Sequence, residues 1–121
     1  EEGFRGFVSL ECPTKVETSA GAMRSIVRMA EYAFEIAVNR EECSAVKIAV
    51  KATTSMVRAE ITLDGIADLF RSVEDEVRWN IFRAFCHLAG GETEIVLAFQ
   101  RGNATILRAS FSSRTKGQRR K

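Results

Sequence analysis

The sequence is poor in the residues that build disulfide frameworks, metal clusters and catalytic dyads. Among its 121 residues are three cysteines, one histidine and one proline. The cysteines are odd in number, widely spaced and without a CxxC pair, which argues against a disulfide scaffold and against a zinc site. We therefore expect reduced thiols that pack as small apolar side chains, and we expect no metal or other cofactor.

The sequence also lacks long hydrophobic runs. No apolar stretch approaches the roughly 20 residues that cross a bilayer. The acidic start at Glu1 and Glu2 lacks the basic-then-apolar layout of a secretory signal. These features predict an intracellular protein that does not use a membrane as its partner.

Few residues are arranged for catalysis. Cys86 and His87 are neighbours in the sequence, and adjacent residues of a helix point in different directions, so they do not form a nucleophile–base pair. The acidic run at 74–76 lacks the alternating ligands and turn glycine of a calcium loop. No phosphate-loop pattern surrounds Gly90 and Gly91. The sequence thus predicts a protein that is not an enzyme.

Charge is distributed unevenly along the chain, whose net charge is +2. Residues 1–113 are expected to form one domain with an acidic balance, and residues 114–121 a basic flexible tail. The tail is either a solvated terminus or a nucleic-acid contact. Its basic residues are Arg114, Lys116, Arg119, Arg120 and Lys121.

Local periodicity predicts an alternation of strands and helices. Apolar and polar residues alternate, as in half-buried strands, over residues 4–10, 45–51, 56–63, 94–100 and 104–111. A first helix follows a cap at Thr18 or Ser19. A second spans 77–88, with an earlier start left open, and has an apolar stripe of Val77, Ile81, Ala84, Phe85 and Leu88 at helical spacing.

Two segments are less decided. Residues 32–38 (YAFEIAV) either continue the first helix or form a strand, and their alternation and aromatic content favour a strand. Residues 72–76 are interpreted as an acidic loop after a short connector at 64–70. Together the elements predict an α+β fold with a mainly antiparallel sheet and two helices on one face, for which a ferredoxin-like order is an alternative.

Two basic pairs form the sharper functional signal. Arg24 and Arg28 lie four residues apart on the first helix, and Arg83 and His87 lie four apart on the second. Each pair therefore forms a stripe along one side of its helix. If the helices lie side by side, the stripes form a positive surface that neutralises phosphates without reading bases.

Two longer stretches resemble one domain of the DNA sliding clamps, which include proliferating cell nuclear antigen and the checkpoint clamp subunits. The first is WNIFRAFCHLAGGETEIVLAFQRGNATILRASF at 79–111, a helix followed by two hairpin strands. The second is SAVKIAVKATTSMVRAEITLDGIADLF at 44–70, paired strands followed by a hydrophobic segment that ends at Phe70. The similarity covers about three-quarters of the chain and rests on pattern and spacing.

The resemblance implies a non-enzymatic processivity factor of DNA replication or repair, located in the nucleus if the organism is eukaryotic. Arg24, Arg28, Arg83 and His87 would contact duplex DNA independently of its sequence. Strands at 94–100 and 104–111, or the strand at 56–63, would pair with a neighbouring subunit of a homo- or hetero-oligomer and present a platform for client proteins. A ferredoxin-like ligand-binding or regulatory module and a single-stranded nucleic-acid binder are the alternatives.

Overall fold

The protein is represented by a computed structural model, which describes residues 6–12, 19–53, 55–99 and 102–112. Five strands and two helices follow one another along the chain: β1 (Phe7–Glu11), α1 (Ala20–Asn39), β2 (Ala45–Ala52), β3 (Met56–Asp64), α2 (Val73–Leu88), β4 (Gly91–Ala98) and β5 (Ala104–Ser112). The tail at 114–121, with its predicted contacts at Arg114, Lys116, Arg119, Arg120 and Lys121, lies outside the described residues.

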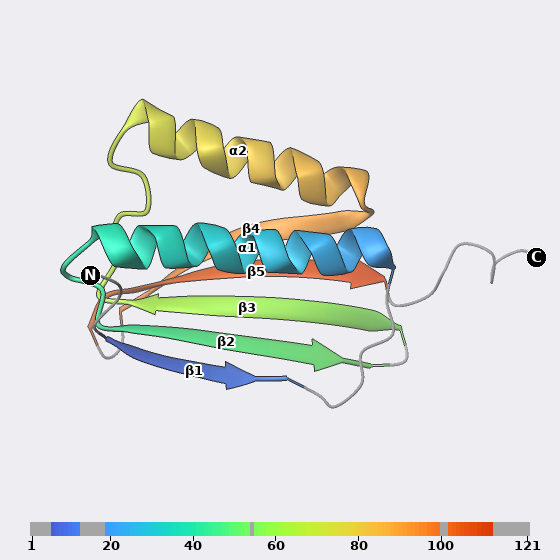
Figure 1. The fold of residues 1–121 in the computed structure, drawn as a ribbon, viewed down its shortest axis with the longest axis horizontal. Coiled ribbons are helices and arrows are strands. Elements are labelled where there is room, and N and C mark those ends of the chain that lie inside the picture. The colour runs from blue at the N-terminus through green and yellow to red at the C-terminus, as the bar shows by residue number, and fades with distance from the viewer. Residues whose placement is uncertain (1–5, 13–18, 54, 100–101, 113–121) are drawn as a thin grey trace, which may run out of the picture.

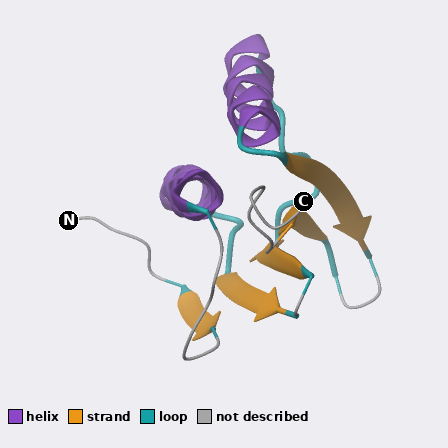
Figure 2. Ribbon diagram, turned by 90° about the vertical axis from the view of Figure 1, so that its right-hand side faces the viewer, coloured by secondary structure: helices purple, strands orange, loops and turns teal. Residues whose placement is uncertain are grey.

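The strands form one sheet in the order β1-β2-β3-β5-β4. Strand β1 pairs with β2 in parallel and the other pairs are antiparallel. Both helices lie on the same side of the curved sheet (Figures 1 and 2). The predicted α+β class, with a mainly antiparallel sheet and two helices, is therefore confirmed.

The strand order changes which segments are edges of the sheet. Strands β3 and β5 are internal, while β1 and β4 are outermost. The predicted subunit edges at 56–63 and 104–111 are therefore wrong, because these strands already use both sides for backbone pairing within the sheet. Of the three predicted edges, only 94–100 corresponds to an outer strand.

Helix α1 is continuous from Ala20 to Asn39, so the prediction of a strand at 32–38 is wrong. Met29, Ala33 and Ala37 are buried at a spacing of four residues, which continues the helical stripe through this segment. Ser19 caps the helix, since its hydroxyl accepts a hydrogen bond from the amide of Ala22 at 3.0 Å.

Helix α2 begins earlier than the sequence suggested. The hydroxyl of Ser72 accepts a hydrogen bond from the amide of Asp75 at 3.1 Å and caps the helix. Residues 74–76 thus form its first turn, where their negative charges complement the positive end of the helix dipole. The prediction of an acidic loop at 72–76 is corrected accordingly.

The buried face of α2 is also different from the predicted one. Trp79, Phe82 and Cys86 are buried against the sheet and α1. Ile81 and Leu88, which belong to the predicted apolar stripe, are 65% and 86% exposed. Helix α2 therefore carries apolar side chains on two faces, and only one of them belongs to the core.

The core lies between the sheet and the two helices. Its largest fully buried side chains include Met29 on α1, Ile61 and Leu63 on β3, and Leu107 on β5. The two outer strands contribute less, and in β1 no residue is fully buried. Neither described helix combines the length and hydropathy that crossing a bilayer requires.

Candidate functional site

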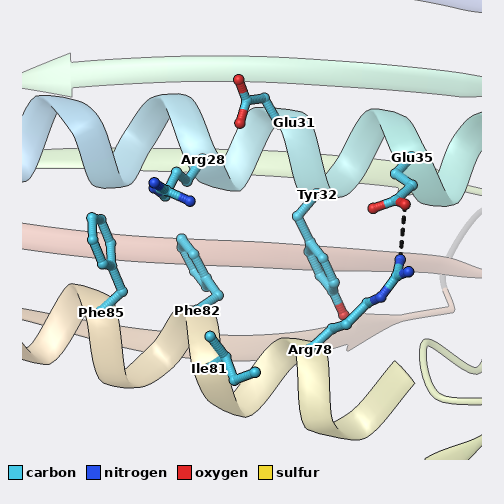
Figure 3. A pocket seen from close by; sticks show the side chains of 8 residues that line it. All are labelled: Arg28, Glu31, Tyr32, Glu35, Arg78, Ile81, Phe82 and Phe85. Carbon is cyan, nitrogen blue, oxygen red and sulfur yellow. Dashed lines mark ion pairs between the residues drawn. The ribbon is translucent and has the colours of Figure 1, made fainter. Parts of the chain in front are cut away.

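A groove lies between α1 and α2, and we call it the α1–α2 groove (Figure 3). Its volume is about 280 Å³. Four side chains come from each helix: Arg28, Glu31, Tyr32 and Glu35 from α1, and Arg78, Ile81, Phe82 and Phe85 from α2.

Aromatic rings form the floor of the groove. The rings of Tyr32 and Phe82 are nearly parallel, with an interplanar angle of 4° and centroids 6.4 Å apart. Trp79, buried below them, lies 5.8 Å from Tyr32 and 5.3 Å from Phe82 between ring centroids. The cluster joins the two helices: Trp79 and Phe82 are buried in it, and Tyr32 is partly exposed to the groove.

Two guanidinium groups lie at opposite ends of the groove. Arg28 is held over the ring of Phe85, with 4.8 Å between its guanidinium carbon and the ring centroid. Arg78 pairs with Glu35 across the helices at 2.8 Å, and this hydrogen bond raises the pKa of Arg78. Within the described ranges Arg28 has no carboxylate partner, so its hydrogen-bond donors are available to a ligand.

The hydroxyl of Tyr32 is the polar group that the groove leaves unsatisfied. It is buried and, among the described residues, has no hydrogen-bond partner. Burial raises the pKa of Tyr32 to about 12, and the nearby carboxylate of Asp75 acts in the same direction. A buried hydroxyl without a partner loses its hydration without compensation, so a ligand that supplies a partner would be stabilised there.

The predicted basic residues do not form one surface. Arg24 and Arg28 share the exposed side of α1, where both line a shallow depression. Arg83 and His87 line a pocket on the flank of α2 that faces β4. Phe85, which contacts Arg28, lies on the other flank of α2, so the helix separates the two pairs. The prediction that these four residues contact DNA phosphates is not tested by this placement.

The cysteines lie apart from this groove. All three are free, with Cys43 and Cys86 buried and Cys12 exposed. Burial raises the pKa of Cys86 to about 11, against an opposing hydrogen bond with Ser25. A thiol with a raised pKa is a poor nucleophile at neutral pH.

Metal ligands are sparse in the described ranges. No group of three or more histidine, cysteine or acidic side chains is close enough there to hold an ion. The carboxylate of Glu35 is engaged by Arg78, and Glu31 points away from α2. The site residues consequently offer rings and guanidinium groups, but no preformed cation cage.

Sequence reasoning missed Tyr32, Glu35 and Arg78 as site residues. One signal was available, because Arg28, Tyr32 and Glu35 recur at helical spacing once 32–38 continues α1. Arg78 already lay on the predicted second helix, but its ion pair with Glu35 of α1 appears only once the two helices are packed together. Which residues of the two helices meet depends on tertiary packing, which local periodicity does not specify.

The chain is a two-layer α+β domain with an aromatic groove between its helices. Comparison with solved structures identifies its fold more specifically. The chain resembles the histidine kinase AdeS of Acinetobacter baumannii at a TM-score of 0.60 and 12% identity, with 90% of this chain and 55% of that chain covered. It thus spans about half the length of that kinase chain. It also resembles the catalytic domain of histidine kinase ThkA at a TM-score of 0.58 and 14% identity, covering 89% of this chain and 80% of that one.

No family model and no curated protein matches the sequence. The structural likeness at this identity establishes the fold, which is that of histidine kinase catalytic domains. The resemblance to DNA sliding clamps is therefore wrong. The predictions that depended on this resemblance are also wrong. They were a function in DNA replication or repair, a nuclear role, subunit pairing through sheet edges, and duplex DNA as the partner.

The prediction that the chain is not an enzyme is overturned by the same finding, because the matched structures are catalytic domains. The ferredoxin-like ligand-binding module and the single-stranded nucleic-acid binder gain no better support from these matches. The clamp pattern misled because a helix followed by a hairpin recurs in many α+β domains, and such a pattern does not identify a family.

Proposed function

We propose that this chain is a histidine-kinase-like signalling domain that binds a nucleotide in the α1–α2 groove. A kinase must hold a nucleotide, and one matched structure is described as a nucleotide-free form of a catalytic domain. The observation that carries the proposal is the combination of stacked rings and guanidinium groups between the two helices. An intracellular location is part of the same proposal.

The groove fits the parts of a nucleotide. A base stacks favourably on aromatic faces, which the partly exposed ring of Tyr32 supplies, backed by the buried ring of Phe82. Guanidinium groups bind phosphate oxygens through paired N–H donors, which Arg28 presents at one end of the groove. The volume of about 280 Å³ is slightly below the ~300–1,000 Å³ of typical ligand pockets, so phosphates would lie along the open mouth.

The first turn of α2 does not serve as the phosphate site. Helix N-termini usually attract anions, but Glu74, Asp75 and Glu76 occupy this one and repel them. Binding of phosphates therefore depends on the arginine side chains. This dependence makes the proposal testable by single substitutions.

Trp79 gives a direct assay, because it is the only tryptophan and lies under the groove. We expect its fluorescence to change saturably when the chain is titrated with ADP or ATP, with and without Mg²⁺. Arg28→Ala removes a charge-assisted contact of about 1.5–3 kcal/mol, and should weaken binding roughly 10- to 100-fold.

Arg24→Ala is the matched control. Arg24 is exposed on the same helix one turn earlier and does not line the α1–α2 groove. The proposal predicts unchanged affinity for this variant. Equal losses in both variants, or no saturable signal with either nucleotide at millimolar concentration, would overturn it.

A further inference from the structure

A second polar pocket lies on the opposite flank of α2, between this helix and β4, and we call it the α2–β4 pocket. Its volume is about 510 Å³. Asn80, Arg83 and His87 line it from α2, and Glu92 and Thr93 line it from β4. The three helix residues lie on one side because they are spaced by three and four positions.

The pocket contains a group without a partner. The hydroxyl oxygen of Thr93 is buried and forms no hydrogen bond with any described residue. A buried hydroxyl in this state is costly, whereas a bound acceptor would satisfy it. Thr93 therefore points to a ligand that carries hydrogen-bond acceptors.

The side chains around Thr93 are also donors. Arg83 is exposed and pairs with no carboxylate in the described part of the chain. A guanidinium has five N–H donors, and an asparagine amide and an imidazole ring add further N–H groups. Together with the hydroxyl of Thr93 they surround the pocket with donors from both α2 and β4.

We propose that the α2–β4 pocket binds a phosphate monoester. Donors that converge from several directions suit the tetrahedral array of phosphoryl oxygens better than the two coplanar oxygens of a carboxylate. The volume exceeds what a free phosphate fills, so the phosphoryl group is carried by a larger molecule. Neighbouring residues of a strand point to opposite faces, so Thr93 faces α2 while Glu92 shares the other face with Glu94 and its partner Arg108. The phosphoryl group therefore lies toward Arg83 and Thr93.

This proposal is independent of nucleotide binding in the α1–α2 groove. The groove uses Ile81, Phe82 and Phe85 of α2, and the pocket uses Asn80, Arg83 and His87. These sets lie on different flanks of one helix. Arg28→Ala should therefore leave the α2–β4 pocket unchanged, so that either proposal can fail alone.

The test follows the backbone amide signals of Gly91, Glu92 and Thr93 by nuclear magnetic resonance. The chain is titrated with inorganic phosphate, phenyl phosphate and acetate at constant ionic strength. We expect saturable shifts with both phosphates, tighter binding of phenyl phosphate, and much weaker binding of acetate. Acetate binding as tight as that of phenyl phosphate, or shifts no larger than those caused by chloride, would overturn the assignment.

Substitutions locate the site. Arg83→Ala should weaken phenyl phosphate binding by about 10-fold or more. Thr93→Val, which replaces the hydroxyl with a methyl group of similar size, should weaken it about 5-fold without loss of stability. Arg24→Ala is the control, and unchanged affinity in Arg83→Ala would refute the proposal even where Thr93→Val weakens binding.

Discussion

A carboxylate oxygen of Asp75 lies 3.6 Å from the guanidinium of Arg40, so the residue after α1 is tied to the first turn of α2. Arg40 is only 8% exposed. It also donates hydrogen bonds to the backbone carbonyls of Asp68 and Leu69, the latter at 2.7 Å. One side chain thereby fixes the connector between β3 and α2, and through it the position of α2 beside α1.

Replacing Arg40 should destabilise the fold strongly. Arg40→Ala leaves the buried carbonyl of Leu69, the part-buried carbonyl of Asp68 and the carboxylate of Asp75 without their partner. Removal of one partner from a buried charged network costs about 3–5 kcal/mol. We expect a loss of this order in the free energy of unfolding, measured by denaturant titration. Arg40→Lys should be intermediate, since an ammonium cannot donate to both carbonyls in a planar fork.

The control for Arg40 is Arg24→Ala. Arg24 is exposed and has no ion pair in the described structure, so its removal should change stability by no more than ~0.5 kcal/mol. A small effect of Arg40→Ala, comparable with that of the control, would mean that the connector is held by its other contacts.

Adjacent residues of α2 should respond oppositely to truncation. Phe82 is 6% exposed in the core, whereas Ile81 is 65% exposed. Phe82→Ala should cost about 3–5 kcal/mol because it leaves a cavity, and Ile81→Ala should cost less than ~1 kcal/mol. Thermal unfolding of the two variants distinguishes the observed helix face from the one that periodicity favoured. A larger loss of stability in Ile81→Ala than in Phe82→Ala would indicate that the predicted face of the helix is the buried one.

Helix α2 also shows why the sequence predicted the presence of a helix better than which of its faces is buried. Its period of 3.6 residues was detectable, but Trp79 and Phe82 on one side compete with Ile81 and Leu88 on the other. Periodicity identifies a helix, while burial depends on what packs against it. The hairpins were easier to predict, because strand alternation and turn residues are signals within a few neighbouring positions of the chain.

The continuation of α1 was missed for a related reason. The buried positions Ala33 and Ala37 are small, so they contribute little to a hydrophobic pattern. Tyr32 and Phe34 dominate the local signal and suggest alternation. The candidate groove depended on this continuation, and therefore could not be predicted until the helix was known to extend past Tyr32.

Glycine substitutions separate backbone strain from steric conflict. Gly65 and Gly102 have φ angles of +98° and +100°. A Cβ at Gly65 would lie 2.0 Å from the carbonyl oxygen of Glu42, whereas a Cβ at Gly102 meets nothing within 4 Å. Both alanine variants carry the strain of a positive φ, about 1–2 kcal/mol.

Only Gly65→Ala must also displace backbone. We therefore expect it to be the more destabilising variant by at least ~1 kcal/mol, with a proportionally lower unfolding midpoint. Equal midpoints would indicate that the segment around Glu42 moves freely enough to accept the methyl group.

Tyr32 permits a direct measurement of its environment, because it is the only tyrosine. Burial raises its pKa to about 12 from the model-peptide value of 10.0. Absorbance of tyrosinate as a function of pH should therefore show a midpoint well above 10 in the native protein and near 10 in denaturant. A native midpoint near 10 would contradict the buried hydroxyl on which the nucleotide groove depends.

The same shift has a consequence for stability at high pH. Between pH 10 and 12 the unfolded chain releases the proton of Tyr32 while the folded chain retains it, so the unfolded state binds fewer protons and stability falls as pH rises. Cys86 acts in the same direction from about pH 9, since its folded pKa is about 11. Denaturant midpoints measured from pH 8 upward should decline accordingly. Tyr32→Phe should flatten the decline in stability above pH 10, and Cys86→Ala should flatten the decline between pH 9 and 11. An unchanged slope in both variants would assign the alkaline loss of stability to other groups.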